Sequence, residues 1–239
     1  MSDTVSNATL LENADLFRLL DRPSREALIA SAVTWPVAQN ASLLKQGDKS
    51  NHLFIVTHGR FKMTVLGKDG AQTALRFMGP GDVIGCAAVF RRIPYPATAT
   101  AVSESKVLAW TAAQFDQLLR RYPQLAVNAL ALMGERTEEM LQRLRAITTE
   151  PSEQRLARAV LRLAKPIASE PQPGGSVDVR LSRQDLAELA DTTLYTASRI
   201  ISAWRRSGIV AGGRGRIVVR DFKRLSQIAE NATGVIWMK

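Results

Sequence analysis

Hydrophobic residues between Trp35 and Trp110 come in short runs, most of them closed by glycine or aspartate. The runs are rich in β-branched and aromatic residues and recur at intervals of roughly ten residues, as short strands joined by turns do. Strands are therefore expected at residues 42–44, 53–56, 61–65, 74–77, 97–102 and 107–110. Gly70, in Lys68-Asp69-Gly70, stands where a hairpin tip needs a positive φ. Such strands predict a β jelly-roll barrel or a sandwich, and the interior of a barrel can hold a small ligand.

The hydrophobic spacing before and after these strands is helical. Residues 10–20 and 25–33 predict two short helices. From Pro123, a suitable first-turn residue, the helical period runs to Ile147. Positions three and four residues apart in this stretch match a coiled-coil seam, and they are Leu130, Met133, Thr137, Met140, Leu144 and Ile147. We expect a long helix at which two copies of the chain associate. The alternative is a helix that packs on the core of its own domain.

The stretch from Leu181 to Ile209 has the pattern of two short helices joined by a tight turn. Ser182 and Asp185 have the spacing of a capping box, and Asp191-Thr192-Thr193 favours a turn followed by a second cap. The second helix is expected to end at Gly208, with an inner side made of Leu194, Ala197, Ile200, Ile201 and Trp204. This is the outline of a helix-turn-helix, whose second helix enters the major groove of DNA. The alternative is an ordinary amphipathic helical hairpin.

The segments around this hairpin complete a winged domain. Pro151 predicts a hinge and then a helix from about Ser152 to Lys165, because proline suits a first turn. The inward positions of that helix are Leu156, Ala159, Val160 and Leu163. Residues 177–179 form an expected strand, and Asp221 is expected to cap a last helix. Two short β runs flank the glycine-rich turn 212–216, which predicts a wing. The chain thus divides into 1–122, 123–148 and 149–239.

Charge changes this picture by indicating a polyanionic partner. The net charge is +10 and the isoelectric point is near 10.3. Residues 150–239 hold 15 Lys and Arg against nine Asp and Glu. From Arg199 to Arg224 there are eight basic residues and one acid, Asp221. A solvated surface usually mixes its signs, so this imbalance predicts contacts with phosphates, including those of Arg214 and Arg216 in the wing.

Several classes of protein are not expected. There is no run of about 18 apolar residues and no secretory signal, so a cytoplasmic protein without membrane contact is expected. The single cysteine, Cys86, excludes an internal disulfide and a multi-cysteine metal site within one chain. Jelly-roll barrels also make cupin enzymes, but these need several metal ligands, and only His52 and His58 are histidines. A basic membrane-surface protein would not need the cap spacing of Ser182 and Thr193. We therefore predict that the chain is not an enzyme.

The order of barrel, long helix, hinge and winged helix-turn-helix resembles the bacterial cAMP receptor protein/FNR family of transcription regulators. Three motifs carry the resemblance: Gly81-Asp82-Val83-Ile84-Gly85, Ala97-Thr98-Ala99-Thr100-Ala101, and Arg183-Gln184-Asp185-Leu186-Ala187 followed by Ser198-Arg199-Ile200. The fold class that it implies is α+β, with a cyclic-nucleotide-binding-type jelly roll. It further implies a homodimer that reads a palindromic operator in double-stranded DNA, responds to an effector and contacts RNA polymerase.

The resemblance places the effector pocket at Gly85, Cys86, Tyr95, Pro96, Ala97 and Thr98. In cAMP-binding members a Glu and an Arg-Ser pair hold the nucleotide, and Cys86, Tyr95 and Pro96 stand there instead. A buried phosphate without partners would cost several kcal/mol, so cAMP is not expected and the effector is unknown.

The cysteine and histidine content also bears on the other cofactors that the resemblance implies. The FNR-type iron–sulfur cluster needs four cysteines and is not expected. Haem-binding members make a gas sensor an alternative function, with His52, His58 and Cys86 as candidate ligands. Alternatively, the histidines are surface residues and Cys86 is a small buried hydrophobe.

The resemblance also assigns DNA contacts. Tyr195, Ser198 and Arg199 fall at base-contacting positions, with Arg199 as a donor to guanine. Members carry an acid at the Tyr195 position, so the half-site is expected to differ there. Ser182, Arg183, Thr193 and Thr196 match positions that hold phosphates.

Overall fold

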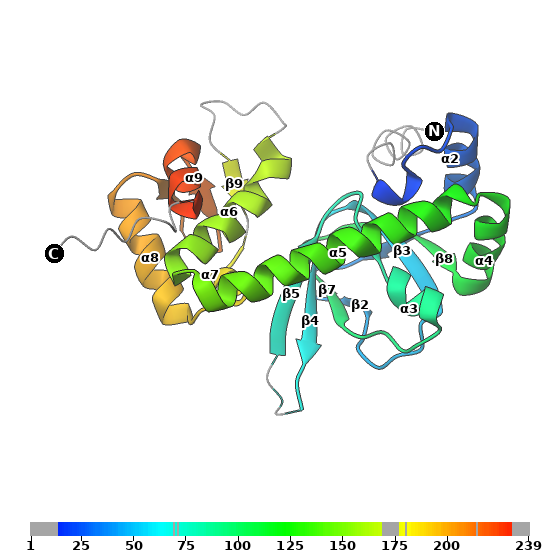
Figure 1. Ribbon diagram of the computed structural model, residues 1–239, viewed down its shortest axis with the longest axis horizontal. Helices are drawn as coiled ribbons and strands as arrows, with labels where there is room; N and C mark the ends of the chain where they lie inside the picture. The colour runs from blue at the N-terminus through cyan, green and yellow to red at the C-terminus, as the bar shows by residue number, and fades with distance from the viewer. Residues whose placement is uncertain are drawn as a thin grey trace. The chain divides into compact units, whose positions relative to one another are not determined.

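A computed structural model describes residues 14–68, 70, 72–168, 177–179, 181–213 and 215–230. The described residues form two compact units, one within Met1–Glu139 and one within Met140–Lys239. The elements combine two antiparallel sheets, several helices and a small winged domain (Figure 1). The α+β fold class is confirmed. Among the described residues no helix is long and apolar enough to span a bilayer.

Two four-stranded sheets make up the β part of the first unit. Their strands are β1 (Val33–Val37), β2 (Ser42–Leu44), β3 (His52–His58), β4 (Phe61–Leu66), β5 (Gln72–Met78), β6 (Val83–Ile84), β7 (Thr98–Ala101) and β8 (Ser105–Thr111). The strand orders are β1-β8-β3-β6 and β2-β7-β4-β5, and the pairs are antiparallel. The expected strands form, whereas β1 and β6 were not among them.

Strand β3 is apolar on both faces because each face has its own core. Successive side chains of a strand point to opposite sides. Leu53 and Ile55 accordingly pack with residues of the helices, such as Phe17 and Leu125, in the helix-side cluster, which forms the helix-side core. Phe54 packs with residues of the other sheet in a second cluster, the cluster between the sheets. One sheet is therefore covered by helices on one face and by a sheet on the other.

The helices of the first unit are the 3-10 turn η1 (Asp15–Phe17), α2 (Arg22–Ala30), α3 (Cys86–Arg91), α4 (Ala112–Arg121) and the first part of α5 (Gln124–Thr149). The first predicted helix is only this 3-10 turn where it is described, and residues 10–13 lie outside the described residues. The second ends at Ala30, because Val33 already pairs with β8. Buried Asn128 of α5 donates to the carbonyls of Leu16 (2.9 Å) and Arg18 (2.6 Å), and so ties the N-terminal turn to α5.

The second unit is a winged helical domain. Its elements are α6 (Ser152–Ala168), β9 (Val177–Val179), α7 (Arg183–Leu189), α8 (Leu194–Arg206), β10 (Val210–Ala211), β11 (Ile217–Val219) and α9 (Phe222–Glu230). The four inward positions predicted for α6 are buried, and β10-β11-β9 forms a small sheet. The inner side predicted for α8 is right except at Leu194, which is 47% exposed because it occupies the first turn.

Candidate nucleic-acid interface and effector site

Helices α7 and α8 begin at side-chain caps. The Ser182 hydroxyl accepts from the backbone N–H of Asp185 (3.0 Å), and the Asp185 carboxylate accepts in return from the Ser182 N–H (3.2 Å). The Thr193 hydroxyl accepts from the N–H of Thr196 (3.1 Å). These caps satisfy N–H groups that a helix start leaves unpaired. The predicted capping box and second cap are both confirmed, and they fix where the helix that would meet DNA begins.

Helix α8 has one buried and one exposed face. Ala197, Ile200, Ile201 and Trp204 are buried. On the other side Tyr195 is 78% exposed, Arg199 is exposed and Ser198 is half-buried. Residues three and four apart share a helix face, so these three side chains lie together. The residues predicted to touch bases are thus neighbours on an accessible surface.

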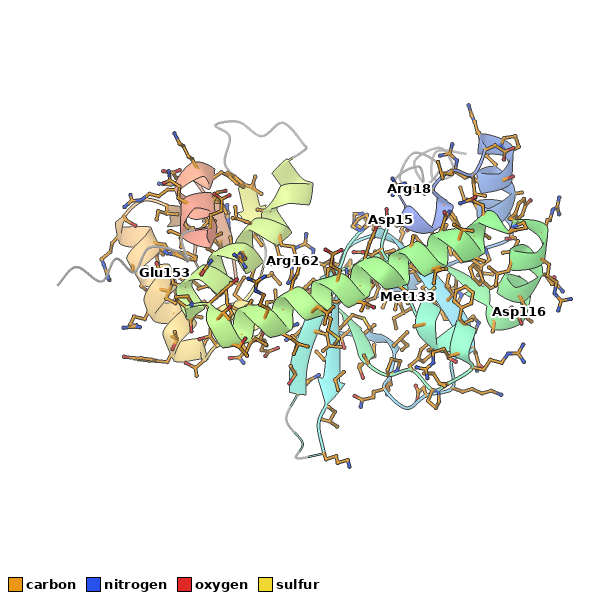
Figure 2. All side chains as sticks on the ribbon, viewed as in Figure 1. Asp15, Arg18, Asp116, Met133, Glu153 and Arg162 are labelled. Carbon is orange, nitrogen blue, oxygen red and sulfur yellow. The ribbon has the colours of Figure 1, made fainter. Side chains whose placement is uncertain are left out.

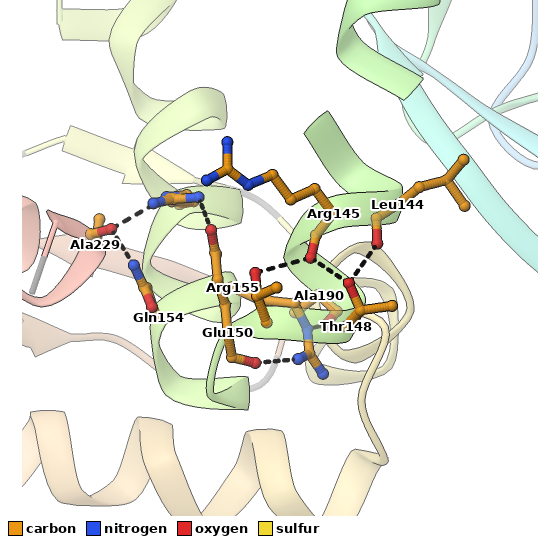
Figure 3. Close-up of polar contacts among 10 residues, drawn as sticks. Leu144, Arg145, Thr148, Glu150, Gln154, Arg155, Ala190 and Ala229 are labelled. Carbon is orange, nitrogen blue, oxygen red and sulfur yellow. Dashed lines mark hydrogen bonds and ion pairs between the residues drawn. The ribbon is translucent and has the colours of Figure 1, made fainter. Parts of the chain in front are cut away.

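The turn between α7 and α8 is held by two arginines that sequence reasoning missed. Asp191 has a φ of 48°, a left-handed backbone conformation that residues other than glycine rarely adopt. Arg143 of α5 donates to both of its carboxylate oxygens (2.8 Å each). Arg155 of α6 donates to the carbonyls of Ala190 (2.8 Å) and Asp191 (2.9 Å), as Figure 3 shows for Ala190. The arginines therefore fix the conformation of the turn that separates the two helices.

Asp191 offers a prediction that separates backbone from ion pair. Both Asp191→Ala and Asp191→Gly remove the carboxylate, but only glycine adopts the left-handed conformation without strain. Asp191→Ala is therefore expected to lower the free energy of unfolding of the second unit by about 1–2 kcal/mol more than Asp191→Gly. Urea unfolding followed by far-UV circular dichroism measures the difference. Equal losses would show that the turn does not hold this residue in the left-handed region.

The wing consists of β10, β11 and the turn between them. Gly212 has a φ of 116°, and a Cβ there would lie 2.5 Å from the carbonyl oxygen of Arg216, so the turn requires glycine. Arg216 is 58% exposed and pairs with Asp178 of β9 (3.2 Å). Arg214, the other predicted phosphate contact, lies outside the described residues. The carboxylate beside Arg216 is a feature that the sequence pattern did not indicate.

Helix α5 carries an exposed apolar stripe. Val127, Leu130, Met140, Leu141, Leu144 and Ile147 are each 43–74% exposed. Met133, labelled in Figure 2, differs from the other predicted seam positions because it packs against the helix-side core of the first unit. A second row, from Val127 through Leu130, Gly134 and Thr137 to Leu141 and Leu144, keeps the same three–four spacing. The two rows share Leu130, Thr137 and Leu144, and only the predicted row includes the half-buried Met133.

The residues predicted for the effector pocket lie on different sides of the fold. Cys86 is buried in the helix-side cluster, whereas Tyr95 is buried in the cluster between the sheets. Ala97 is buried, Pro96 is exposed, and the Thr98 hydroxyl accepts from the N–H of Gln46 (3.0 Å). The fold thus does not bring the Cys86 and Tyr95 side chains together, because residues 86–91 form a helix whose first side chain points to the other core.

Tyr95 and Gly85 form a tight contact with strand β3. The Tyr95 hydroxyl donates to the carbonyl of His52 (2.6 Å) and accepts from its N–H (3.1 Å). Burial raises the pKa of this phenol. Gly85 has a φ of 86°, and a Cβ there would lie 2.9 Å from the His52 carbonyl oxygen. The Tyr95 hydroxyl is therefore engaged with the backbone.

The candidate haem ligands have other partners. The His52 ring packs on Trp35 (centroids 4.9 Å apart) and Phe54 (5.9 Å), and burial lowers its pKa. His58 is exposed at the end of the same strand. Burial raises the pKa of the Cys86 thiol to about 12, so the thiolate that metals prefer is disfavoured. Within the described ranges no three His, Cys, Asp or Glu side chains are grouped as a metal site would need.

Comparison with known proteins matches both units. Residues 35–122 match the family model of a cyclic nucleotide-binding domain, and residues 154–228 match that of a Crp-like helix-turn-helix domain. The cyclic AMP receptor protein of Thermus thermophilus is 29% identical over 191 residues, which are 80% of this chain and 85% of that protein. The fumarate and nitrate reduction regulatory protein of Yersinia pestis is 22% identical over 196 residues, 82% of this chain and 78% of that protein. The structure of FixK2 from Bradyrhizobium japonicum has the same fold, with a TM-score of 0.72 at 20% identity over 82% of this chain and 96% of that one. With a cyclic nucleotide-binding domain followed by a Crp-like helix-turn-helix, the chain belongs to the CRP/FNR family of transcription regulators.

Proposed function

We propose that the protein is a homodimer that reads a palindromic operator with α8 in the major groove and changes its activity when a small effector binds the first unit. The observation that carries the proposal is the accessible face of Tyr195, Ser198 and Arg199 on a capped helix whose other face is buried. In this scheme residues 1–122 sense the effector, 123–148 hold the dimer and 149–239 bind DNA. RNA polymerase is the expected further partner, since the relatives are transcription regulators.

Selection from random duplexes tests this proposal. A dimer with two reading helices is expected to enrich inverted half-sites about one helical turn apart, 10–10.5 base pairs from centre to centre. Affinity that is equal for all sequences would leave only a general basic protein. Selection of a single unrepeated site would contradict the dimer while leaving base recognition intact.

Arg199 is proposed to read guanine. Its guanidinium can donate two hydrogen bonds to O6 and N7 of one base. Arg199→Ala is expected to lose roughly 1–3 kcal/mol of discrimination at one base pair of each half-site. Arg205→Ala is the matched control, since Arg205 is also exposed on α8 but lies in its last turn. Competition binding with operators changed one base pair at a time measures both variants. A loss spread evenly over all operators would assign Arg199 to phosphate.

The proposed phosphate contacts fix register rather than sequence. They are Ser182, Arg183, Thr193, Thr196, Arg214 and Arg216. The Ser182 hydroxyl already donates a hydrogen bond to the Asp185 carboxylate (2.7 Å). Arg183 is therefore a better donor to a DNA phosphate than Ser182. Arg216 would have to share its charge between Asp178 and a phosphate. We therefore expect Arg183 to contribute more to the salt dependence of binding than Ser182 or Arg216.

We propose that the effector is not cAMP bound in the way that the family's cAMP-binding members hold it. Where relatives have the Arg-Ser pair this chain has Tyr95 and Pro96, and the Tyr95 hydroxyl is engaged with His52. A cyclic phosphate placed there would lack a cation, which is costly in a buried site. Haem remains the alternative cofactor of the family, and an absorption spectrum of the purified protein tests it directly.

A further inference from the structure

A ring of alternating charges joins the sensor sheets to α5 within the first unit. Asp82, in the turn before β6, accepts from Arg136 of α5 (3.0 Å) and pairs with Arg76 of β5 (3.8 Å). Glu139 of α5 pairs with the same two arginines, at 3.3 Å from Arg76 and 3.4 Å from Arg136. Each acid thus contacts both bases. Glu139 is the acid of the ring that lies on α5, and its ion pair with Arg76 connects α5 to β5.

Arg60 gives this ring an excess of positive charge. It lies just before β4, burial lowers the pKa of its guanidinium, and Asp82 is the charge that opposes this effect. Within the described part of the chain, no carboxylate forms an ion pair with Arg60. Arg60 is therefore a third guanidinium group close to Asp82, beside the two that pair with Asp82 and Glu139. The side chains of Arg76 and Arg136 are still 26% and 23% exposed, so a solute can reach them.

We infer that Arg60, Arg76 and Arg136 form the binding site for an anionic group of the effector, a phosphoryl group or a carboxylate. The planar guanidinium presents paired donors that match both groups. The incoming anion replaces Glu139 on Arg76 and Arg136, while Asp82 stays in place because it also accepts from the backbone N–H of Gly79 (2.8 Å). Glu139 acts as an internal competitor for the site.

This site explains how binding could reach the helix that carries the exposed stripe. Glu139 and Arg136 are the α5 members of the ring, and Met140 follows directly in sequence. An anion that takes the place of Glu139 removes one of the contacts that hold α5 against β5. A ligand shifts a conformational equilibrium only through such a difference in contacts between two states. The inference rests on the proposed function in taking the first unit to bind an effector.

Calorimetric titration of the full-length protein with inorganic phosphate tests the site, with chloride adjusted to keep the ionic strength constant. Glu139→Gln removes the competitor and is expected to raise the affinity for phosphate about tenfold, the effect of roughly one charge-assisted hydrogen bond. Arg76→Gln is expected to lower it by about tenfold or more. Arg120→Gln is the control, because Arg120 is an exposed arginine of α4 and should leave the affinity unchanged.

The outcomes separate the possible explanations. If Glu139→Gln binds phosphate no more tightly than the unchanged protein, the ring is purely structural and the inference is wrong. An equal loss in Arg76→Gln and Arg120→Gln would mean diffuse attraction by the basic surface. Arg76→Lys keeps the charge without the planar donors, and circular dichroism checks that each variant folds. The titration contains no DNA, so a negative result beside intact operator binding overturns this site alone, and loss of sequence-specific DNA binding in the unchanged protein counts against the proposed function alone.

Discussion

Replacing Leu144 by glutamate is expected to leave the protein monomeric and to lower its affinity for a palindromic operator by about a hundredfold or more. Leu144 is 57% exposed and belongs to both possible rows of the α5 stripe. A pair of glutamates facing each other in an apolar seam would be desolvated and mutually repelled, so the two helices should separate. A monomer then binds each half-site alone and loses the gain of linked binding. Light scattering gives the mass, and mobility shifts give the affinity.

Leu66→Glu is the matched control for this experiment. Leu66 is also 57% exposed, but it lies at the end of β4 rather than on α5. The Leu66→Glu protein should remain dimeric. Met140→Glu and Leu141→Glu then distinguish the two rows, since the larger loss of dimer marks the side chain nearer the axis. A Leu144→Glu protein of unchanged mass that still binds the operator tightly would place the dimer interface elsewhere.

Trp204→Ala is expected to destabilise the second unit by about 3–5 kcal/mol, enough to abolish operator binding. Trp204 is 2% exposed in the core beneath α8, and its indole N–H donates to Glu153 of α6 (2.9 Å), which Figure 2 labels. The substitution leaves a cavity and removes the partner of a carboxylate. Thermal and urea unfolding measure the loss.

Tyr195→Ala provides the comparison for Trp204→Ala on the same helix. Tyr195 is 78% exposed, so its removal should change stability by no more than about 0.5 kcal/mol while altering the preferred operator. Similar losses of stability in both variants would mean that the buried and exposed faces of α8 have been misassigned.

Much of the candidate interface followed from local sequence. Caps and turns depend on a few neighbouring residues, so Ser182, Asp185 and Thr193 located the helix starts correctly. Apolar residues at helical spacing identified the buried side of α8, because that spacing places them on one face. The prediction that Leu194 lies on the inner side was wrong, because the spacing assigns a residue to a helix face but does not tell how far the domain core extends along that face.

Contacts between distant segments were not predictable in this way. Nothing near Met133 indicates that it packs against the core of the first unit while Leu141 is exposed. The effector-pocket residues were assigned from the family resemblance, and that assignment could not show that α3 turns Cys86 into a different core from that of Tyr95. The ion pair between Asp82 and Arg136 joins residues 54 positions apart, and no local rule connects them.

The sequence by itself determined the order of elements, the caps and the polar face of α8, because each depends on residues within a few positions of one another. The tertiary structure alone decided which charged side chains from different strands and helices come into contact. Pairings such as Arg143 with Asp191 and Arg136 with Asp82 arise only when separate elements pack, since the free energy that selects them comes from burial of the whole core and not from the segments that carry them.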